Sequence, residues 1–532
     1  MRNGFEESLR WGDRLKSVLQ GEKIAWVFSL LSLGFGIVLL LDAYLTHNIN
    51  MGLFFNSDEL YLSALFREIY KGQFSFFNWH FSAATFIFPD WIMYGFVFSI
   101  FRNSYLSFPA FFVVQTLLAW GLSFGICHLL MRDKLNALLG SSFFLSLSLF
   151  FALKDIYPFT IVMYSVTHFG DFLSWLATTF LLLNALSQTF ASRRFIEVST
   201  FIGVGLLSFL ATGSDRLFVP HWIAPAIVAM GILNFNRRIG RGKFLSHSGS
   251  IVLGAISGLG LYHLYPHVFN GVGIAIVPAK DNAPVLFRMG MDFFKAHGVI
   301  SGIFLLAGFG WIALIHQMWF SIAREDRFDT PTLFLAIFFS VGLIVSLVTM
   351  VFSTYRIMDD LELRYLLPYL LGPILLLPIL LQRVLNDIVE RFFYIAAILI
   401  LLVVELPTAP HLGHIVWADY YPQEVSCVDR ALSREGTTRG IALYWDARRF
   451  AMMSKIHAFD TAQVNDDLSP YFWINSDRSY RGVFRFALVP ESSEGAIFER
   501  NLVSRMGTPA VVKNCPGIKV DLWSKPFGVL IK

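Results

Sequence analysis

The sequence predicts a polytopic α-helical membrane protein of about eleven transmembrane helices, followed by a C-terminal extracytoplasmic α/β domain. Of its 532 residues, 55% are hydrophobic and only 15% are charged, and the mean hydropathy is +0.58. A soluble protein of this length is far less apolar. The hydropathy falls sharply after residue 406, and the remaining segment, 407–532, is long enough to bury a core of its own.

The predicted transmembrane helices are apolar runs of roughly the length that a helix needs to cross a hydrocarbon core. Residues 1–23 precede the first run and are too long and too charged for a cleavable signal, so we expect a cytoplasmic N-terminal segment and a retained first helix. The eleven runs within the membrane domain, residues 24–406, are 24–45, 108–131, 135–153, 169–186, 195–211, 218–233, 251–265, 299–320, 333–352, 365–381 and 392–406.

Loop charges orient these helices. If residues 86–101 lie along the membrane surface, within a first outer loop at 46–107, the basic loops all share the side of the N-terminus. By the positive-inside rule that side is cytoplasmic. If residues 86–101 cross instead, the count becomes twelve and the charge bias is lost. The basic loops lie at 132–134, 193–194, 237–243, 324–327 and 383–391.

The stretch 53–70 contains the strongest candidate for chemistry. Asp58 and Glu59 are adjacent and open a helix-like apolar pattern, with Asn56 or Ser57 available as a cap. A carboxylate at the outer edge of the bilayer, beneath a roof of helices, is suited to act as a general base. Acids in a first helical turn also complement the helix dipole, and this plain alternative stays open.

Ionisable residues gather at the outer ends of several predicted helices. Such groups are costly within a membrane unless they are paired or face a wet cavity, so we expect a shared polar cavity. The alternative for each residue is an ordinary interfacial position. The set comprises Asp58, Glu59, His168, Asp171, Asp215, Arg216, His221, Glu362 and Arg364.

The outer segment 265–298 is predicted to close over this cavity as a lid that excludes water, with a plain connecting loop as the alternative. In the C-terminal domain, the runs 440–445, 483–489 and 518–523 have the composition of strands. Helix-like segments separate these runs, which is the basis for expecting an α/β domain.

Cysteine spacing and net charge exclude several kinds of site. Cys427 and Cys515 both lie in the outer domain, where a disulfide is permitted, although the sequence leaves open whether they meet. Cys127 is expected to be a small apolar residue in a span. No zinc spacing or phosphate-cradling glycine loop is present, and we expect neither metal nor cofactor. A net charge of +4 without a basic patch does not favour nucleic acid as a partner.

These features resemble the membrane-embedded glycosyltransferases of the GT-C fold, which include the protein O-mannosyltransferases and the aminoarabinose transferase of lipid A. As in that family, a first helix precedes an outer loop with an acidic pair, here Asp58 and Glu59, and a surface helix, here 60–70. Asp171 begins a later helix in a setting similar to the family's Arg-x-Asp-x-x-Leu. Residues 362–368, Glu-Leu-Arg-Tyr-Leu-Leu-Pro, are similar to its Arg-Tyr-Leu-x-Pro element.

The chain also departs from the family pattern. Many members have Lys-Pro-Pro-Leu where this chain has Phe-Ile-Phe-Pro-Asp at 86–90, so a basic group is missing. The resemblance is therefore to a distant member of the family.

The resemblance implies an inverting transfer of a sugar from a polyprenyl-phosphate carrier to a glycan, lipid or protein acceptor, at the outer face of a bacterial inner membrane. Asp58 would deprotonate the acceptor hydroxyl, and Arg216 or Arg364 would stabilise the departing phosphate. The remaining substrate-binding residues would be Glu59, His168, Asp171, Asp215, His221 and Glu362.

Two other functions remain open. A transporter or flippase of a lipid-linked or anionic substrate would also place charges in a membrane cavity, but it more often shows paired halves or broken helices near the midplane, and this sequence has no evident internal symmetry. A non-catalytic membrane scaffold would use the outer domain for binding and leave the acids of the membrane domain unexplained.

Overall fold

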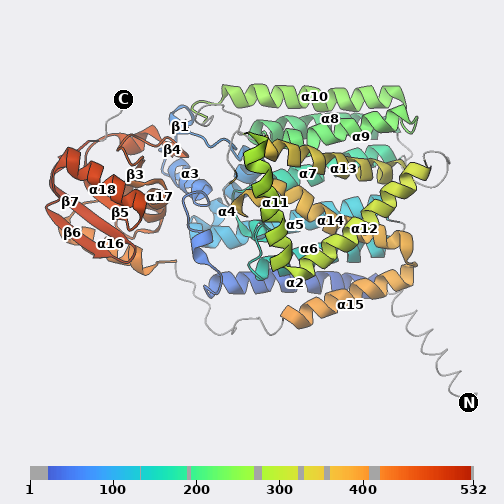
Figure 1. Ribbon diagram of the computed structural model, residues 1–532, viewed down its shortest axis with the longest axis horizontal. Coiled ribbons are helices and arrows are strands. Elements are labelled where there is room, and N and C mark those ends of the chain that lie inside the picture. Colours follow the sequence, from blue (N-terminus) through green and yellow to red (C-terminus); the bar gives the residue numbers. More distant parts are fainter. Residues whose placement is uncertain are drawn as a thin grey trace, which may run out of the picture.

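The computed structural model describes residues 22–131, 133–187, 193–268, 278–321, 329–352, 357, 360–405 and 420–528. Most of the predicted N-terminal segment, the basic loop at 324–327 and residues 407–419 lie outside these ranges. Within them, a bundle of long helices lies end to end with a smaller α/β domain, which follows it in sequence (Figure 1).

Eight of the described helices are long and apolar enough to cross a membrane. A ninth span results if the two helices α11 (Ala279–Ala296) and α12 (Gly298–Ser321), which meet at a bend of 111°, count as one. The eight are α2 (Glu22–Leu45), α5 (Ser104–Leu130), α6 (Lys134–Leu153), α7 (Phe169–Ser187), α8 (Arg193–Ser214), α10 (Arg241–Leu264), α13 (Thr330–Val351) and α14 (Leu367–Val384), the last of which follows the short helix η6 (Asp360–Leu366).

All eleven predicted apolar runs lie on helices, but not all of these helices meet the length and charge limits of a span. The run at 218–233 forms the short helices η5 (Val219–Ile223) and α9 (Ala224–Phe235). The last run belongs to α15 (Asp387–Glu405), whose first turn contains Asp387 and Glu390. The structure thus supports a multi-pass helical membrane protein, and the count of eleven stays a prediction.

Residues 86–101 are too short to cross the membrane as one helix. They fold into η3 (Ile87–Trp91) and α4 (Ile92–Phe101), which together extend about 22 Å at 1.5 Å per residue. A hydrocarbon core is about 30 Å thick. This length is consistent with the predicted place of the segment in the first outer loop.

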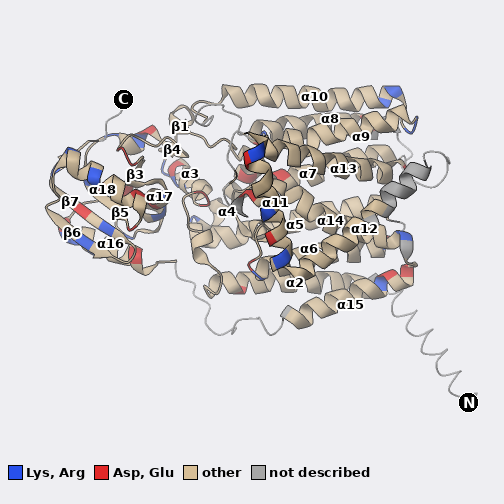
Figure 2. Cartoon of the chain, viewed as in Figure 1, with Lys and Arg blue, Asp and Glu red and all other residues tan. Residues whose placement is uncertain are grey.

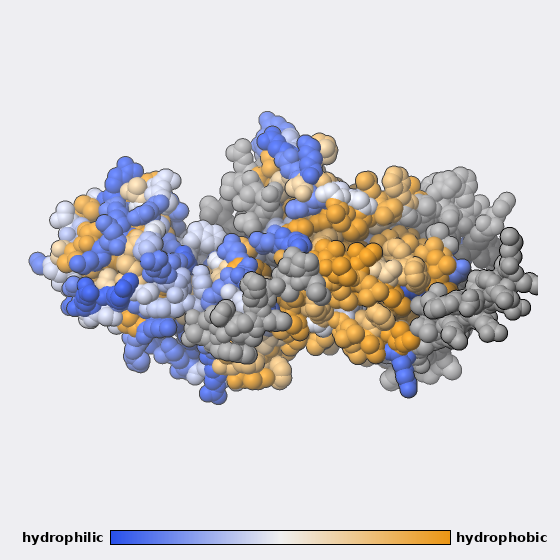
Figure 3. Space-filling view, turned by 90° about the horizontal axis from the view of Figure 1, so that it is seen from below, coloured by the Kyte–Doolittle hydropathy of each residue, from blue (hydrophilic) through white to orange (hydrophobic). Residues whose placement is uncertain are grey.

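The bundle presents an apolar surface where lipid is expected. On the face that Figure 3 shows, the visible surface of the bundle is mostly hydrophobic, and that of the α/β domain is more hydrophilic. Leu253, Ile256 and Phe309 are among the exposed large hydrophobic residues. In Figure 2, Lys and Arg mark the end of α10 that lies away from the α/β domain, and this end is the helix start at Arg241.

The predicted first outer loop, 46–107, also contains η1 (Met51–Leu53), α3 (Tyr61–Tyr70), η2 (Phe76–Asn78) and the strand β1 (Trp79–His80). A helix is present at the position of the predicted surface helix, 60–70, as α3. Its cap differs from the expectation, because Asn56 Oδ1 instead accepts the backbone N–H groups of Asp58 and Glu59, both at 2.9 Å. Asn56 therefore shapes the tight turn that displays the acidic pair ahead of the helix.

The C-terminal domain contains a five-stranded sheet in the order β3-β2-β5-β7-β6. The strand β2 is parallel to both of its neighbours, whereas β7 is antiparallel to β5 and β6. The elements are α16 (Gln423–Glu435), β2 (Arg439–Leu443), α17 (Tyr444–Met453), β3 (Asp460–Val464), β4 (Asn475–Ser476), η8 (Asp477–Tyr480), β5 (Phe484–Pro490), α18 (Ser493–Met506), β6 (Val511–Cys515) and β7 (Ile518–Phe527).

One predicted strand was wrong at its end. The run 440–445 was expected to be a single strand, but β2 stops at Leu443 and α17 begins at Tyr444. Tyr444 and Trp445 continue the apolar run of the sequence, but they belong to α17 and not to β2. This boundary places both rings at the carboxyl end of a parallel strand.

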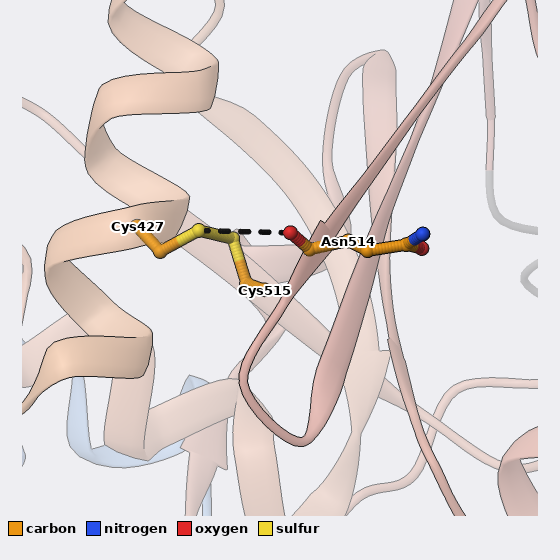
Figure 4. The surroundings of a disulfide bond; sticks show 3 residues. All are labelled: Cys427, Asn514 and Cys515. Carbon is orange, nitrogen blue, oxygen red and sulfur yellow. Dashed lines mark hydrogen bonds between the residues drawn. A yellow bond between two sulfur atoms is a disulfide. The ribbon is translucent and has the colours of Figure 1, made fainter.

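A disulfide joins Cys427 on α16 to Cys515 at the end of β6, with an S–S distance of 2.02 Å and Cα atoms 5.7 Å apart (Figure 4). The Asn514 carbonyl oxygen lies 3.9 Å from the Cys427 sulfur. Cys127 is buried in α5 and free, as expected for a small core residue.

The first outer loop is fastened to the α/β domain by backbone and side-chain contacts. β1 pairs antiparallel with β4. Arg448, on α17, is buried and donates to the carbonyl oxygens of Ser57 and Ile474. Arg67, on α3, donates to the Ala451 carbonyl oxygen at 2.8 Å. The turn that contains the acidic pair is thus held by residues far away in the sequence.

Candidate active site

A cavity of about 410 Å³ lies where the first outer loop, the segment before α14 and the α/β domain meet. Asp58 comes from the loop, and Glu362 and Arg364 come from η6. The α/β domain supplies the other lining residues, which are Tyr444, Trp445, Val464, Asn465, Tyr471, Trp473 and Glu494.

Asp58 is oriented from two sides. Its backbone is held in the turn that Asn56 shapes, and its carboxylate oxygen Oδ1 accepts a hydrogen bond from the Tyr444 hydroxyl. Ser57, one residue earlier, donates to the Tyr444 carbonyl oxygen at 2.6 Å. Tyr444 therefore holds the turn through both its hydroxyl and its carbonyl oxygen, and the Asp58 carboxylate still lines the cavity.

Glu59 occupies a different environment from its neighbour. Its side chain is buried at 2% exposure, and Oε2 accepts the backbone N–H groups of Ser165 at 3.1 Å and Val166 at 3.4 Å. Burial, reinforced by the negative charge of Asp58, raises the pKa of the Glu59 carboxyl well above its ordinary value. This placement favours an anchoring role for Glu59 beneath the turn over the predicted contact with substrate.

Arg364 supplies positive charge to the cavity. Its Nη2 donates to the Tyr365 hydroxyl at 3.3 Å, and the guanidinium lies 5.1 Å from the centre of that ring. Its Nε is buried without an acceptor among the described residues. The Arg364 charge also acts on both Asp58 and Glu59. A half-buried guanidinium with a donor to spare is suited to bind an anion.

Four of the other predicted residues form two buried acid–histidine pairs. Asp171 Oδ2 lies 2.8 Å from His221 Nδ1, and Asp215 Oδ2 lies 2.5 Å from His168 Nδ1. All four side chains are buried among α7, η5 and the turn after α8. Pairing offsets the cost of burying each polar group. The structure brings these residues together, but apart from the lining of the cavity.

A third acid packs against this cluster. Asp90, on η3, is buried, and a Cβ at Gly170 would collide with its carboxylate. In the sequence, Asp90 is distinguished only as the last residue of Phe-Ile-Phe-Pro-Asp at 86–90. Glycine at position 170 is what allows the carboxylate to approach the backbone of α7.

The acid–histidine pairs contact the segment that contains Arg364. The His168 ring centre lies 5.2 Å from that of Tyr365, next to Arg364. His168 itself has φ of 71°, a left-handed conformation that is uncommon for a residue other than glycine. The Tyr369 hydroxyl donates to the His221 carbonyl oxygen at 2.6 Å. These contacts make the pairs a support for η6 and the start of α14.

Arg216 lies outside both the cavity lining and the two acid–histidine pairs. It is exposed, and its guanidinium stacks on the Tyr262 ring at 4.5 Å from the ring centre. Of the nine residues that were expected to share one cavity, three line it: Asp58, Glu362 and Arg364. The other six lie outside this lining: the four acid–histidine residues satisfy one another, Glu59 is buried beneath the turn, and Arg216 is exposed.

The predicted lid segment, 265–298, is helical over much of its length. Residues 269–277 lie outside the described ranges, and the rest includes α11, which runs across the other helices at the end of the bundle nearer the α/β domain (Figure 1). Asn282 on α11 accepts the Ile357 backbone N–H at 3.0 Å. Leu286 of α11 and Leu363 of η6 belong to the same hydrophobic cluster.

Sequence reasoning missed the contribution of the α/β domain to the cavity. The composition of the run 440–445 predicts Tyr444 and Trp445 at the end of a strand, and Tyr471, Trp473 and Glu494 follow no recognisable motif. The one available signal is that an aromatic pair directly follows a buried strand. Within the ranges that the structure describes, no three His, Cys, Asp or Glu side chains gather in a geometry that could hold a metal ion.

Comparison with known proteins found no match for this chain among protein-family models, curated proteins or solved structures.

Proposed function

We propose that this protein is an inverting glycosyltransferase of the GT-C type, which moves a sugar from a polyprenyl-phosphate carrier to an acceptor at the outer face of the membrane. The observation that supports the proposal is that Asp58 and Arg364, an acid and a cation from distant segments, line one cavity. An acceptor hydroxyl needs a base and a departing phosphate needs a cation.

In the proposed reaction, Asp58 accepts the proton of the acceptor hydroxyl as its oxygen attacks the anomeric carbon of the donor sugar. The bond between that carbon and the phosphate oxygen breaks on the opposite face, so the configuration inverts. The electron pair leaves with the polyprenyl phosphate, whose charge Arg364 stabilises. Glu362, on the same wall as Arg364, binds hydroxyl groups of the sugar. Phosphate is a good leaving group, so the reaction needs no second acid.

The proposed topology has eleven spans, a cytoplasmic N-terminus and an extracytoplasmic C-terminal domain in a bacterial inner membrane. The disulfide between Cys427 and Cys515 supports an oxidising compartment for that domain. Single cysteines introduced at Arg238 and Lys280, in an otherwise cysteine-free chain, test the orientation. We expect a membrane-impermeant reagent added from outside to label position 280 and not 238. Labelling of both from one side would contradict the topology.

The function is tested with purified full-length protein in lipid nanodiscs, supplied with polyprenyl phosphates that contain radiolabelled sugars and with extracts of cell-envelope acceptors. We expect the label to leave the lipid and appear in a product with inverted anomeric configuration. Label that crosses the bilayer of a proteoliposome while still attached to its lipid would indicate a flippase. If the label is neither transferred nor moved across the bilayer, the non-catalytic scaffold is favoured.

A further inference from the structure

The cavity uses the edge of the sheet at which α/β proteins commonly bind ligands. Tyr444 and Trp445 follow the carboxyl end of β2, and Asn465 follows that of β3. Glu494 lies in the first turn of α18, the helix after β5. These three strands are the parallel ones of the sheet. Ligands of open α/β sheets bind in the crevice outside the carboxyl ends of such strands.

This wall of the cavity is aromatic. Trp445 is 54% exposed, which is unusual for a large aromatic side chain on a largely hydrophilic domain. Tyr471 and Trp473 line the same cavity. The Tyr444 ring lies edge-on to the rings of Trp445 at 4.9 Å and Tyr471 at 5.3 Å between centres. An exposed tryptophan held in an aromatic cluster within a cavity is a typical ligand contact.

The backbone behind these rings is held firmly. Gln463 Nε2 donates to the carbonyl oxygen of Tyr471 at 2.8 Å and to that of Trp473. The Arg448 guanidinium, which also holds the Asp58 turn, donates to the Trp473 carbonyl oxygen at 3.3 Å. The aromatic wall and the candidate base thus share one support, so the distance between them is set by the fold.

We propose that Trp445, Tyr471 and Trp473 form the binding subsite of a saccharide acceptor. The C–H face of a pyranose ring has weakly positive hydrogens that complement the negative face of an indole. Its hydroxyl rim can be bound by the Glu494 carboxylate and the Asn465 amide at the edges of the wall. A sugar seated here presents a hydroxyl toward Asp58 on the neighbouring wall.

The assignment of this subsite to the acceptor rests on the proposed function. The position of the aromatic wall favours the acceptor over the donor sugar as its occupant. The donor arrives with its lipid from the bundle, whose contribution to the cavity is Glu362 and Arg364. The aromatic residues belong to the α/β domain on the opposite side. A glycan acceptor is therefore favoured over the donor sugar as the occupant of the aromatic wall.

The test is saturation-transfer NMR on the full chain in nanodiscs, without donor, using methyl glycosides of glucose, galactose, mannose and N-acetylglucosamine as probes. We expect at least one probe to bind with a dissociation constant of about 1–10 mM, as for a small ligand held by few contacts. Saturation should be strongest at the ring C–H protons that stack on the indole. Absence of binding by every probe overturns the proposal.

Variants localise the binding. Trp445→Ala and Trp473→Ala should each weaken probe binding about tenfold, whereas Trp445→Phe should retain most of it. Phe77→Ala is the matched control, because Phe77 is a 74% exposed aromatic residue of the first outer loop outside the cavity lining. Binding that is unchanged in both tryptophan variants overturns the proposal, and so does equal weakening by Phe77→Ala.

Two further measurements separate this inference from the proposed function. The Asp58→Asn variant should lose transfer and still bind the probe within twofold of the parent chain. Probe binding without any transfer activity would leave the saccharide site standing and remove the proposed reaction. Competition between the probe and a polyprenyl-phosphate sugar would assign the wall to the donor and overturn the acceptor role.

Discussion

The Tyr444 hydroxyl donates a hydrogen bond to the Asp58 carboxylate, although 386 residues separate the two in the sequence. Burial raises the pKa of Tyr444 well above its ordinary value, and the negative charge of Asp58 reinforces that rise. The hydroxyl therefore stays protonated near neutral pH and remains a donor. The α/β domain in this way orients the candidate base of the membrane domain.

Replacing Tyr444 by Phe removes this donor and keeps the ring. We expect kcat for sugar transfer to fall about tenfold, the scale of one hydrogen bond to a charged group, because Asp58 is less firmly oriented. KM for the lipid donor should not change, since Arg364 is untouched. Steady-state kinetics over a range of donor concentrations measure both. A rise in the donor KM at constant kcat would show that Tyr444 binds substrate and does not position the base.

Asp58 and Glu59 should respond differently to loss of charge. Asp58→Asn removes the basic oxygen, and we expect transfer to fall at least about 100-fold, with folding preserved. Glu59→Gln keeps an oxygen that can accept the Ser165 N–H, so its effect should be several-fold at most. Initial rates of label transfer compare the two variants. A folded, donor-binding Asp58→Asn protein with the parental rate would return the acidic pair to a structural role.

Arg364 should control the affinity for the anionic donor. Arg364→Ala should weaken donor binding about tenfold or more, and Arg364→Lys should weaken it less, because lysine keeps the charge but loses the planar fork. Arg216→Ala is the matched control, since Arg216 is exposed and stacks on Tyr262 outside the cavity lining. Equilibrium binding of a fluorescent polyprenyl phosphate measures all three. Stronger weakening by Arg216→Ala would transfer the assignment to that residue.

Glu68 should make stability depend on pH. Burial raises the pKa of this carboxyl, on α3, to about 7. A raised folded-state pKa means that the folded protein binds the proton more tightly, so its stabilising effect is complete below about pH 4.5 and is lost as the pH rises toward 7. The slope is at most about 1.4 kcal/mol per pH unit. Glu68→Gln should flatten this part of the profile in thermal unfolding between pH 4.5 and 7, and an unchanged profile would contradict the assignment.

The disulfide should stabilise the α/β domain. Its cysteines are 88 residues apart, and closing a loop of that length contributes roughly 4–5 kcal/mol in the chain-entropy model. Reductant should therefore lower the Tm of the parent chain and of a Cys127→Ala control. It should leave a Cys427→Ser, Cys515→Ser double variant unchanged at an already lower Tm. A reductant-sensitive Tm in the double variant would exclude this bond as the cause.

The membrane helices could be predicted because the sequence contains long apolar runs with few charges. A chain within lipid must satisfy every backbone polar group internally, so such runs become helices whatever their neighbours are. The surface helix α3 could be predicted for a related reason, since its apolar spacing appears in ten consecutive residues. The number of spans does not follow from apolar runs alone, because α15 begins with two acids and because packing sets the bend between α11 and α12.

Local patterns also misled where two elements meet. The run through Tyr444 and Trp445 has the composition of one strand, and nothing in its spacing marks the start of α17. Backbone hydrogen bonds to neighbouring strands decide where β2 ends, and those strands are distant in the sequence. The places of Tyr444 and Trp445 in the cavity lining were missed for this reason.

The sequence by itself determined which residues are charged and that they lie near the ends of apolar helices. Only the tertiary structure decided how they pair. Asp171 and Asp215 pair with histidines of the bundle, whereas Asp58 accepts a hydrogen bond from a tyrosine of the α/β domain. The physical reason is that a buried polar group must be satisfied by whichever partner the packing brings within hydrogen-bond distance, and that partner is set by the three-dimensional fold.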